Sequence, residues 1–345
     1  MLKYTVKKIL GMIPMLLIIT FIIYWLLDLT PGDPTSYLMD PESLARLTNE
    51  QMAALRAQYG LDDPFVIRYF KWLFRILQGD FGYSTSSGVP VIQIMAQRLP
   101  ATLELAVAAL LISTALGSIL GVLGAIYKGS IGDNVLTVAG MIGVSIPQFF
   151  FGVCAILIFA LNLGWLPVGG RTDTNAVTFL DRAKYMVLPA LVLGVSMTAG
   201  VMRYARSSML DTMNKDYIKT ARSKGIPEWR VNLIHGFRVS LTPVIVLIGF
   251  RLPTLIAGSV VIETVFQWPG IGSAFNTAVR SQNYNLVMML ALLFVFMTLF
   301  ASTFVDIMTA ALDPRAVSYT HLRAHETDQY LVCRLLLEKS PRDCS

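Results

Sequence analysis

The stretch TLELAVAALLISTALGSILGVLGAIY, residues 102–127, decides the fold. Glu104 is its only charged residue, and the remainder is apolar or small. Crossing a hydrocarbon core about 30 Å thick takes roughly 20 mostly apolar residues in a helix. Each backbone amide must be hydrogen-bonded within the segment, because no water is available inside the bilayer. The stretch therefore predicts a helix that spans a membrane.

Five further stretches have the same apolar character. They occupy residues 9–29, 135–163, 187–202, 239–262 and 286–311. The chain of 345 residues is 54% hydrophobic and 14% charged, which is too apolar for an ordinary soluble domain. The sequence thus predicts an all-α integral membrane protein with six transmembrane helices. The fourth stretch is short and follows Pro189, so we expect it to start inside the bilayer or to pack against neighbours that shield it.

Small residues recur in the second and third stretches, at Gly117, Gly121 and Gly124 and at Gly140 and Gly143. Such spacing lets two helix backbones approach closely, which predicts a packed bundle. The alternative is that glycine is simply common in membrane helices.

Basic residues are concentrated where they set the orientation of the chain. Lys3, Lys7 and Lys8 precede the first stretch, and residues 203–238 hold eight basic against three acidic residues. Short cytoplasmic segments carry an excess of Lys and Arg. We therefore expect a multi-pass protein of the cell membrane, surrounded by lipid, with both termini in the cytoplasm. The net charge of +6 follows from this topology and requires no nucleic-acid partner.

Residues 30–100 fall outside the cell by parity and form an external insertion after the first helix. Within the insertion, residues 64–77 place aromatic and apolar side chains largely on one helical face. This segment suits a helix at the membrane interface, with its cations reaching toward phosphates. A helix of a small external subdomain packed on the bundle explains the pattern equally well.

The loop 203–238 reads as two helical pieces joined near residues 225–227, where glycine can end one helix and proline can begin the next. The string DYIKTARSKG, residues 216–225, lies in the first piece. Its small residues Thr220 and Ala221 suit a helix that docks into the cleft of a partner protein. The plainer interpretation is a solvated basic loop that obeys only the topology rule.

Seven strings in order identify the chain as similar to a known family, the permease subunits of peptide and nickel ABC importers. The resemblance covers residues 3–315. The strings are PGDP at 31–34, YGLDDP at 59–64, GDFGYS at 79–84, RLPATLEL at 98–105, DYIKTARSKG at 216–225, ETVFQWPGIG at 263–272 and LDPR at 312–315.

The resemblance implies that loop 203–238 is a coupling element that docks on an ABC ATPase subunit. The family's signature has small residues followed four positions later by glycine, and its usual acidic first member is Lys219 here. The residues implied in coupling are Asp216, Tyr217, Lys219, Thr220, Ala221 and Gly225. The implied partners are ATPase subunits, a second permease subunit and an external solute-binding protein that delivers a peptide, a nickel chelate or a related small solute.

The chain carries no motif that would make it an enzyme. A phosphate-cradling loop G-x-x-x-x-G-K-[ST] is absent from the sequence, as are G-x-S-x-G and H-E-x-x-H. We therefore expect no catalytic site, no cofactor and no metal in this subunit. An ion-gradient-driven secondary transporter is the main rival, and it would need acidic residues inside its spans. Glu104 and Asp306 lie near the ends of theirs.

Four residues are candidates for the translocation path or an external gate. Arg251 interrupts the fifth stretch next to Pro253, so the helix is expected to bend or unwind there. Arg251 could meet a substrate carboxylate, or it could pair with Glu263 or a helix carbonyl. Glu263, Pro269 and Gly270 lie outside the fifth stretch, where they could contact a binding protein or merely cap a helix.

The expected domains are 1–29 as the N-terminal segment and first helix, 30–100 as the external insertion, and 101–315 as the five-helix permease core. Residues 316–345 depart from the family. The string SYTHLRAHET resembles tails of unrelated translated chains, so we hypothesise a sequencing or frameshift artefact. His321 and His325 lack further ligands and do not predict a metal site.

Overall fold

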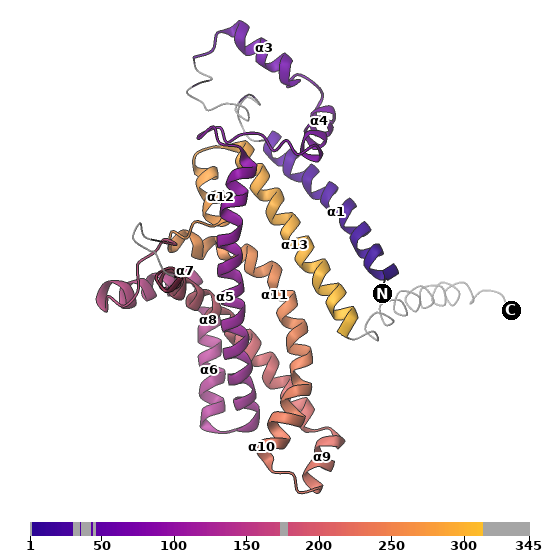
Figure 1. Cartoon of the computed structure of the whole chain (residues 1–345), viewed down its shortest axis with the longest axis vertical. Coiled ribbons are helices and arrows are strands. Elements are labelled where there is room, and N and C mark those ends of the chain that lie inside the picture. The colour runs from indigo at the N-terminus through magenta and orange to yellow at the C-terminus, as the bar shows by residue number, and fades with distance from the viewer. Residues whose placement is uncertain (1, 30–34, 36–42, 44–45, 173–178, 313–345) are drawn as a thin grey trace, which may run out of the picture.

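The computed structural model describes residues 2–29, 35, 43, 46–172 and 179–312. Helices make up most of this part of the chain. Figure 1 shows them as an elongated bundle, with α9 (Asp216–Ser223) and α10 (Glu228–Arg230) at one end. α3 (Asn49–Tyr59), α4 (Phe65–Leu77) and α12 (Ile271–Arg280) lie toward the other end. The non-family tail 316–345 lies outside the described residues.

The helices α5 (Val91–Ile126) and α8 (Phe179–Met213) form the centre of the bundle. A Cβ added at Gly117 would collide with Val201, and one at Gly121 would collide with the backbone of Met202. Only glycine permits so close an approach, which confirms the close helix contact predicted at these glycines of the second stretch. Gly143, by contrast, faces open space, so the prediction is wrong there.

The fourth helix is not short. α8 runs for 35 residues with Pro189 inside it. Proline removes one backbone hydrogen bond, yet membrane helices tolerate this loss when neighbouring helices pack around the site. Leu188 and Ala190 on either side of the proline are buried. The helix therefore continues well past residue 202, into the segment expected to be a loop.

The third apolar stretch is broken. α6 (Ile131–Ser145) ends before Pro147, and α7 (Gln148–Ala155) continues as the π-helix η2 (Ile156–Asn162). The two arms are bent by 100°. Ile146 is extended, with ψ of 125°, because the ring of the following proline clashes with an α-helical conformation. A single continuous helix over 135–163 is therefore wrong.

Four described helices are long and apolar enough to cross a membrane, and the bent pair makes a fifth if it counts as one span. The four are α1 (Leu2–Asp28), α5, α8 and α13 (Tyr284–Leu312). α11 (Arg238–Val265) is a 28-residue helix of the same bundle, although several of its side chains between 241 and 258 lie outside the description. The expected six spans thus go beyond what the described helices establish.

The helix α4 packs on the end of α1. Tyr69 and Trp72 are buried, and their rings contact Tyr24. Arg68 pairs with Asp28 at 2.9 Å. The opposite face of α4 leaves large apolar side chains such as Phe74 exposed. The helix is thus packed on the bundle, as one interpretation of the sequence predicted, and also presents an apolar outer face, as the other did.

Candidate functional site

The chain reverses direction after α8 to form a small helical tip. α9 ends at Ser223, and Gly225 follows in the left-handed region with φ of 73°. The N–H groups of Gly225 and Ile226 donate to carbonyls of the last turn of α9. Pro227 then precedes α10, which continues into the π-helix η3 (Val231–Phe237). The predicted junction of two helical pieces at 225–227 is confirmed.

An apolar cluster holds the tip together. Ile218 and Val231 are fully buried, and Ala221 is nearly so. Met213 from the end of α8 and Ile226 from the turn pack against them. Ala221 therefore faces the chain itself. The expectation that its small side chain receives a partner protein does not match this orientation, because helical position places it beside Ile218.

The opposite face of α9 is exposed. Asp216, Tyr217, Lys219 and Thr220 all point away from the cluster. Lys219 donates to the Asp216 carboxylate at 2.9 Å, and Arg222 donates to that of Glu228 at 2.9 Å. These charges are thus balanced within the tip, while the Tyr217 ring stays exposed.

Sequence reasoning missed three exposed apolar residues of the tip, namely Trp229, Leu233 and Ile234. They stand beside the exposed charges of α9 at the same end of the molecule. The available signal was a tryptophan within a segment otherwise rich in basic residues. An exposed tryptophan is a typical anchor of a protein interface, so Trp229 is a candidate contact residue at this end of the molecule.

A partly buried ion pair ties the neighbouring helix ends together. Arg206 of α8 donates two hydrogen bonds of 2.7 Å to the Asp133 carboxylate at the start of α6. The N–H of Gly129 donates to the same carboxylate at 3.0 Å. The pair fixes the turn between α5 and α6 against the helix that leads into the tip. Its two partners are 73 residues apart, so no local pattern predicts it.

At the other end of the molecule, Glu263 is fully buried near the end of α11. Its carboxylate accepts hydrogen bonds from the Thr102 hydroxyl at 2.7 Å and from the Ser273 backbone N–H at 3.0 Å. The Ser259 hydroxyl donates a third at 3.2 Å. A Cβ at Gly270 would collide with this carboxylate. Glu263 thus caps the N-terminus of α12, where a negative charge is stabilised.

The turn between α11 and α12 is also joined to other elements. The indole N–H of Trp268 donates to the carbonyl of Ala101 at 2.8 Å. The carbonyl of Phe266 accepts from the N–H of Gly170 at 2.8 Å. The turn therefore connects α5, α11, α12 and the segment after η2.

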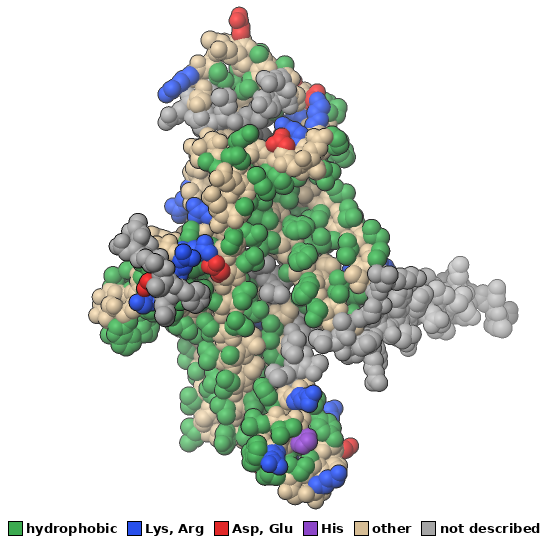
Figure 2. Space-filling view, in the orientation of Figure 1, with side chains coloured by type: hydrophobic (Ala, Val, Ile, Leu, Met, Phe, Trp, Pro, Cys, Tyr) green, Lys and Arg blue, Asp and Glu red, His purple; other side chains and the backbone are tan. Residues whose placement is uncertain are grey.

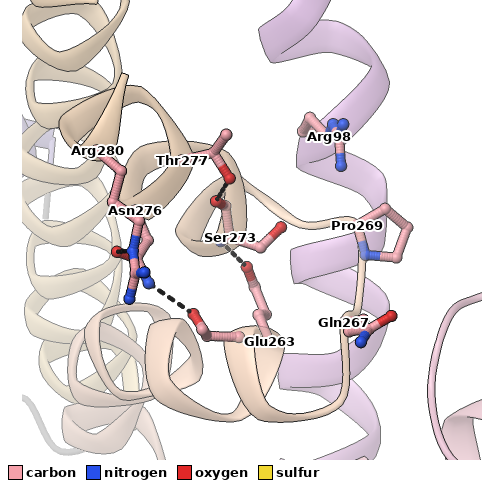
Figure 3. Close-up of a pocket in the computed structure, with 9 residues that line it drawn as sticks. Arg98, Glu263, Gln267, Pro269, Ser273, Asn276, Thr277 and Arg280 are labelled. Atoms are coloured by element: carbon pink, nitrogen blue, oxygen red, sulfur yellow. Dashed lines mark hydrogen bonds between the residues drawn. The ribbon is translucent and has the colours of Figure 1, made fainter. Parts of the chain in front are cut away.

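A pocket of about 390 Å³ opens beside this turn (Figure 3). Arg98 of α5 lies on one side of it, and Arg280 of α12 lies on the other. The lining residues are Arg98, Glu263, Thr264, Gln267, Pro269, Ser273, Asn276, Thr277 and Arg280. The structure therefore brings Glu263 and Pro269 together at one pocket.

Arg251 does not belong to that pocket. α11 is helical through this position, so the expected unwinding is wrong. The guanidinium lies over Gly200 of α8 and donates to the carbonyl of Met197 at 3.4 Å. Glu263 lies 12 positions farther along the same helix, about 18 Å away, which is too far for an ion pair. The sequence left Glu263 and a helix carbonyl as structural partners for Arg251. In the structure the carbonyl of Met197 accepts a hydrogen bond from its guanidinium.

The family described as "Binding-protein-dependent transport system inner membrane component" matches residues 113–318, and the N-terminal region of the same kind of protein matches residues 1–106. The chain belongs to this family. Together the two matches cover most of the permease.

The relatives are similar over almost their whole length. The oligopeptide transport system permease protein AppB of Bacillus subtilis is 38% identical over 317 residues, covering 91% of this chain and 99% of the relative. The glutathione transport system permease protein GsiC of Salmonella typhimurium is 34% identical, covering 92% and 100%. The dipeptide transport system permease protein DppB of Escherichia coli is 33% identical, covering 91% and 98%.

A solved structure has the same fold as the permease. Inward-facing conformations of the MetNI methionine ABC transporter match with a TM-score of 0.53 and 17% identity. The match covers 65% of this chain and 98% of that one. The permease is therefore a multi-pass membrane subunit with the fold of an ABC importer.

Proposed function

We propose that this permease subunit moves peptides across the cell membrane, driven by ATP that separate ABC ATPase subunits hydrolyse. The names of the relatives support a peptide cargo, because they include oligopeptide, glutathione and dipeptide systems. Nickel chelates and related small solutes are the second candidate cargo. No finding supports the rival, a secondary transporter. The subunit is not itself an enzyme.

The proposed topology has six spans. They are α1, α5, the bent pair of α6 with α7 and η2, α8, α11 and α13. Both termini then lie in the cytoplasm, and residues 30–100 lie outside. Figure 2 supports this orientation, because Lys and Arg side chains gather at the end that carries α9 and α10. The domain division into 1–29, 30–100 and the core 101–315 follows from the same topology.

The observation that carries the proposed mechanism is the split of α9 into a buried face and an exposed face. Ile218 and Ala221 anchor the helix, while Tyr217, Lys219 and Thr220 are exposed on the face that would contact an ATPase. We propose that this face, within loop 203–238, docks in a groove of the ATPase subunit.

The helix α8 links this docking face to the bundle. It runs without a break for 35 residues, packs along α5 and contributes Met213 to the tip. Movement of the tip is therefore carried into the bundle through a rigid element. Gly225 ends α9 in a conformation that favours glycine, and so sets where the docking face stops.

The joint around Glu263, Pro269 and Gly270 is the proposed external gate. Its hydrogen bonds connect α5, α11 and α12, so these helices would move together. Arg251 holds α11 against α8 deeper in the bundle. A second permease subunit would complete the path, and an external solute-binding protein would deliver the cargo.

Reconstitution in lipid vesicles tests the proposal. The complex of this chain, a second permease and the ATPases should accumulate peptide only with hydrolysable ATP and with the binding protein present. Uptake by a proton or sodium gradient alone would reject it. Labelling of Cys variants at Lys219 and at Arg280 from the two sides of the membrane checks the topology independently.

A further inference from the structure

The pocket beside α12 has a chemistry that the proposed transport cycle does not explain. Among the described residues that line it, Arg98 and Arg280 are the only basic ones and Glu263 is the only acidic one. Glu263 is fully buried, and its carboxylate already accepts hydrogen bonds from groups on α5, α11 and α12. The part of the pocket open to solvent is therefore dominated by two guanidinium groups.

The two arginines differ in how their N–H donors are used. It is half-buried on α5, and among the residues that the structure describes it has no ion pair or side-chain hydrogen bond. A guanidinium carries five N–H donors in a planar fork that fits a carboxylate. Arg280 is exposed and uses one of its donors on the Asn276 side chain at 3.3 Å. Most donors of both arginines remain available to an anion.

The turn that ends α11 forms part of the rim of the same pocket. Gln267 has φ of 50°, in the left-handed region that is uncommon for a residue other than glycine. Gln267 directly follows the last turn of α11, where a left-handed residue commonly ends a helix, and Gln282 has the same conformation after α12. Here Trp268, the next residue, is held by its indole and its backbone N–H, which donates to the carbonyl of Glu263 at 2.8 Å. The neutral amide of Gln267 is thereby placed at the pocket.

We propose that this pocket binds a carboxylate, which an acidic side chain of the solute-binding protein supplies when that protein docks. The proposal rests on the transport function proposed above and names the chemistry of one contact in it. Two arginines and a carboxylate are complementary in charge, and such pairs determine orientation and association rate at protein interfaces. The volume of about 390 Å³ admits the end of a side chain together with bridging water.

The shape of the site favours a docked protein over the cargo. The inner wall is the buried Glu263 carboxylate, and its bonds to Thr102 and Ser273 close the space between α5 and α12. A cargo that passed this wall would have to break both bonds and approach a negative charge. A group that enters and leaves by the same opening meets neither obstacle.

The test uses the complete complex in lipid nanodiscs, with the solute-binding protein of the same transport system as the probe. The rate of ATP hydrolysis is measured against the concentration of that protein. The variants are Arg98→Gln, Arg280→Gln and the double variant. Arg75→Gln is the matched control, because Arg75 is an exposed arginine of α4 outside the pocket. A second arm compares uptake of peptides with free and amidated C-termini.

We expect the double variant to raise the half-saturating concentration of binding protein roughly ten-fold at low salt, with a smaller difference at high salt. Arg75→Gln and the rate without binding protein should not change. Exposed Arg280 can be replaced without disturbing the fold, so a shift in Arg280→Gln alone already supports the proposal.

A half-saturating concentration within two-fold of the wild type in the double variant would overturn the proposal. So would loss of discrimination between free and amidated peptides at unchanged half-saturation, since that result would assign the pocket to the cargo. If the wild-type complex is not stimulated at all, the transport function itself fails. That outcome is visible before any variant is made.

Discussion

Thr102 and Glu263 are 161 residues apart in the sequence and share a hydrogen bond of 2.7 Å. The Thr102 hydroxyl also accepts a bond of 2.8 Å from the N–H of Ile271. One hydroxyl thereby satisfies a buried carboxylate and a buried helix N-terminus at once. Because the three residues belong to α5, α11 and α12, this contact holds the gate end of the bundle together.

Thr102→Val should therefore destabilise the protein. Valine keeps the shape but leaves the Ile271 N–H without an acceptor and the Glu263 carboxylate with one donor fewer, a loss of about 1–3 kcal/mol. Thermal unfolding in detergent, followed by tryptophan fluorescence, measures it. Thr114→Val is the matched control on the same helix, because the buried Thr114 hydroxyl has no hydrogen-bond partner in the described part of the chain. Equal melting temperatures for the two variants would contradict the prediction.

Gly225→Leu should uncouple ATP hydrolysis from uptake. A Cβ at Gly225 meets no atom of this chain within 4 Å, so any collision would come from the docked ATPase. The left-handed φ adds a backbone cost of about 1–2 kcal/mol for leucine. Uptake should fall while membrane insertion and ATP hydrolysis persist.

Gly129→Leu separates docking from backbone strain. Gly129 has φ of 78° and also faces open space, in the turn between α5 and α6. The two variants therefore carry the same strain, but only Gly225 lies in the segment proposed to dock on the ATPase. If both lose uptake to the same extent, strain and not docking explains the defect.

Substitutions at two neighbouring residues of α9, one exposed and one buried, should have different effects. Tyr217→Ala removes an exposed ring and should weaken ATPase binding roughly ten-fold, the loss expected for one aromatic anchor of an interface. Ile218→Ala removes a buried anchor, so the tip itself should loosen and trypsin should cleave at Lys219 or Arg222. Pull-down of the ATPase and limited proteolysis measure the two effects. If trypsin cleaves Tyr217→Ala as fast as it cleaves Ile218→Ala, then Tyr217 also holds the tip together and the assignment of the two faces is wrong.

The Asp133–Arg206 pair should behave as a unit. Arg206→Gln leaves a buried carboxylate without its main partner, whereas the double variant Asp133→Asn with Arg206→Gln removes the charge as well. We expect the double variant to melt at a higher temperature than the Arg206→Gln variant. A double variant less stable than either single one would show that the two side chains act independently.

The sequence predicted those features of the fold that depend only on a local property of the chain. Uninterrupted apolar length predicted the helix over 102–127, and the order of glycine and proline located the junction at 225–227. The break at Pro147 was available in principle, because proline restricts the residue before it. The angle of 100° between α6 and α7 could not be predicted from the sequence, since it depends on how α7 packs against its neighbours.

By itself the sequence determined that this is a helical membrane protein, because helix formation in lipid depends on local apolar length and charge. It also located the short helical pieces on either side of residues 225–227. Only the tertiary structure decided that Ala221 faces inward, that Glu263 caps α12 and that Arg98 and Arg280 share a pocket. These facts depend on residues far apart in the chain. Their side chains meet only when helix packing has set the distances between them.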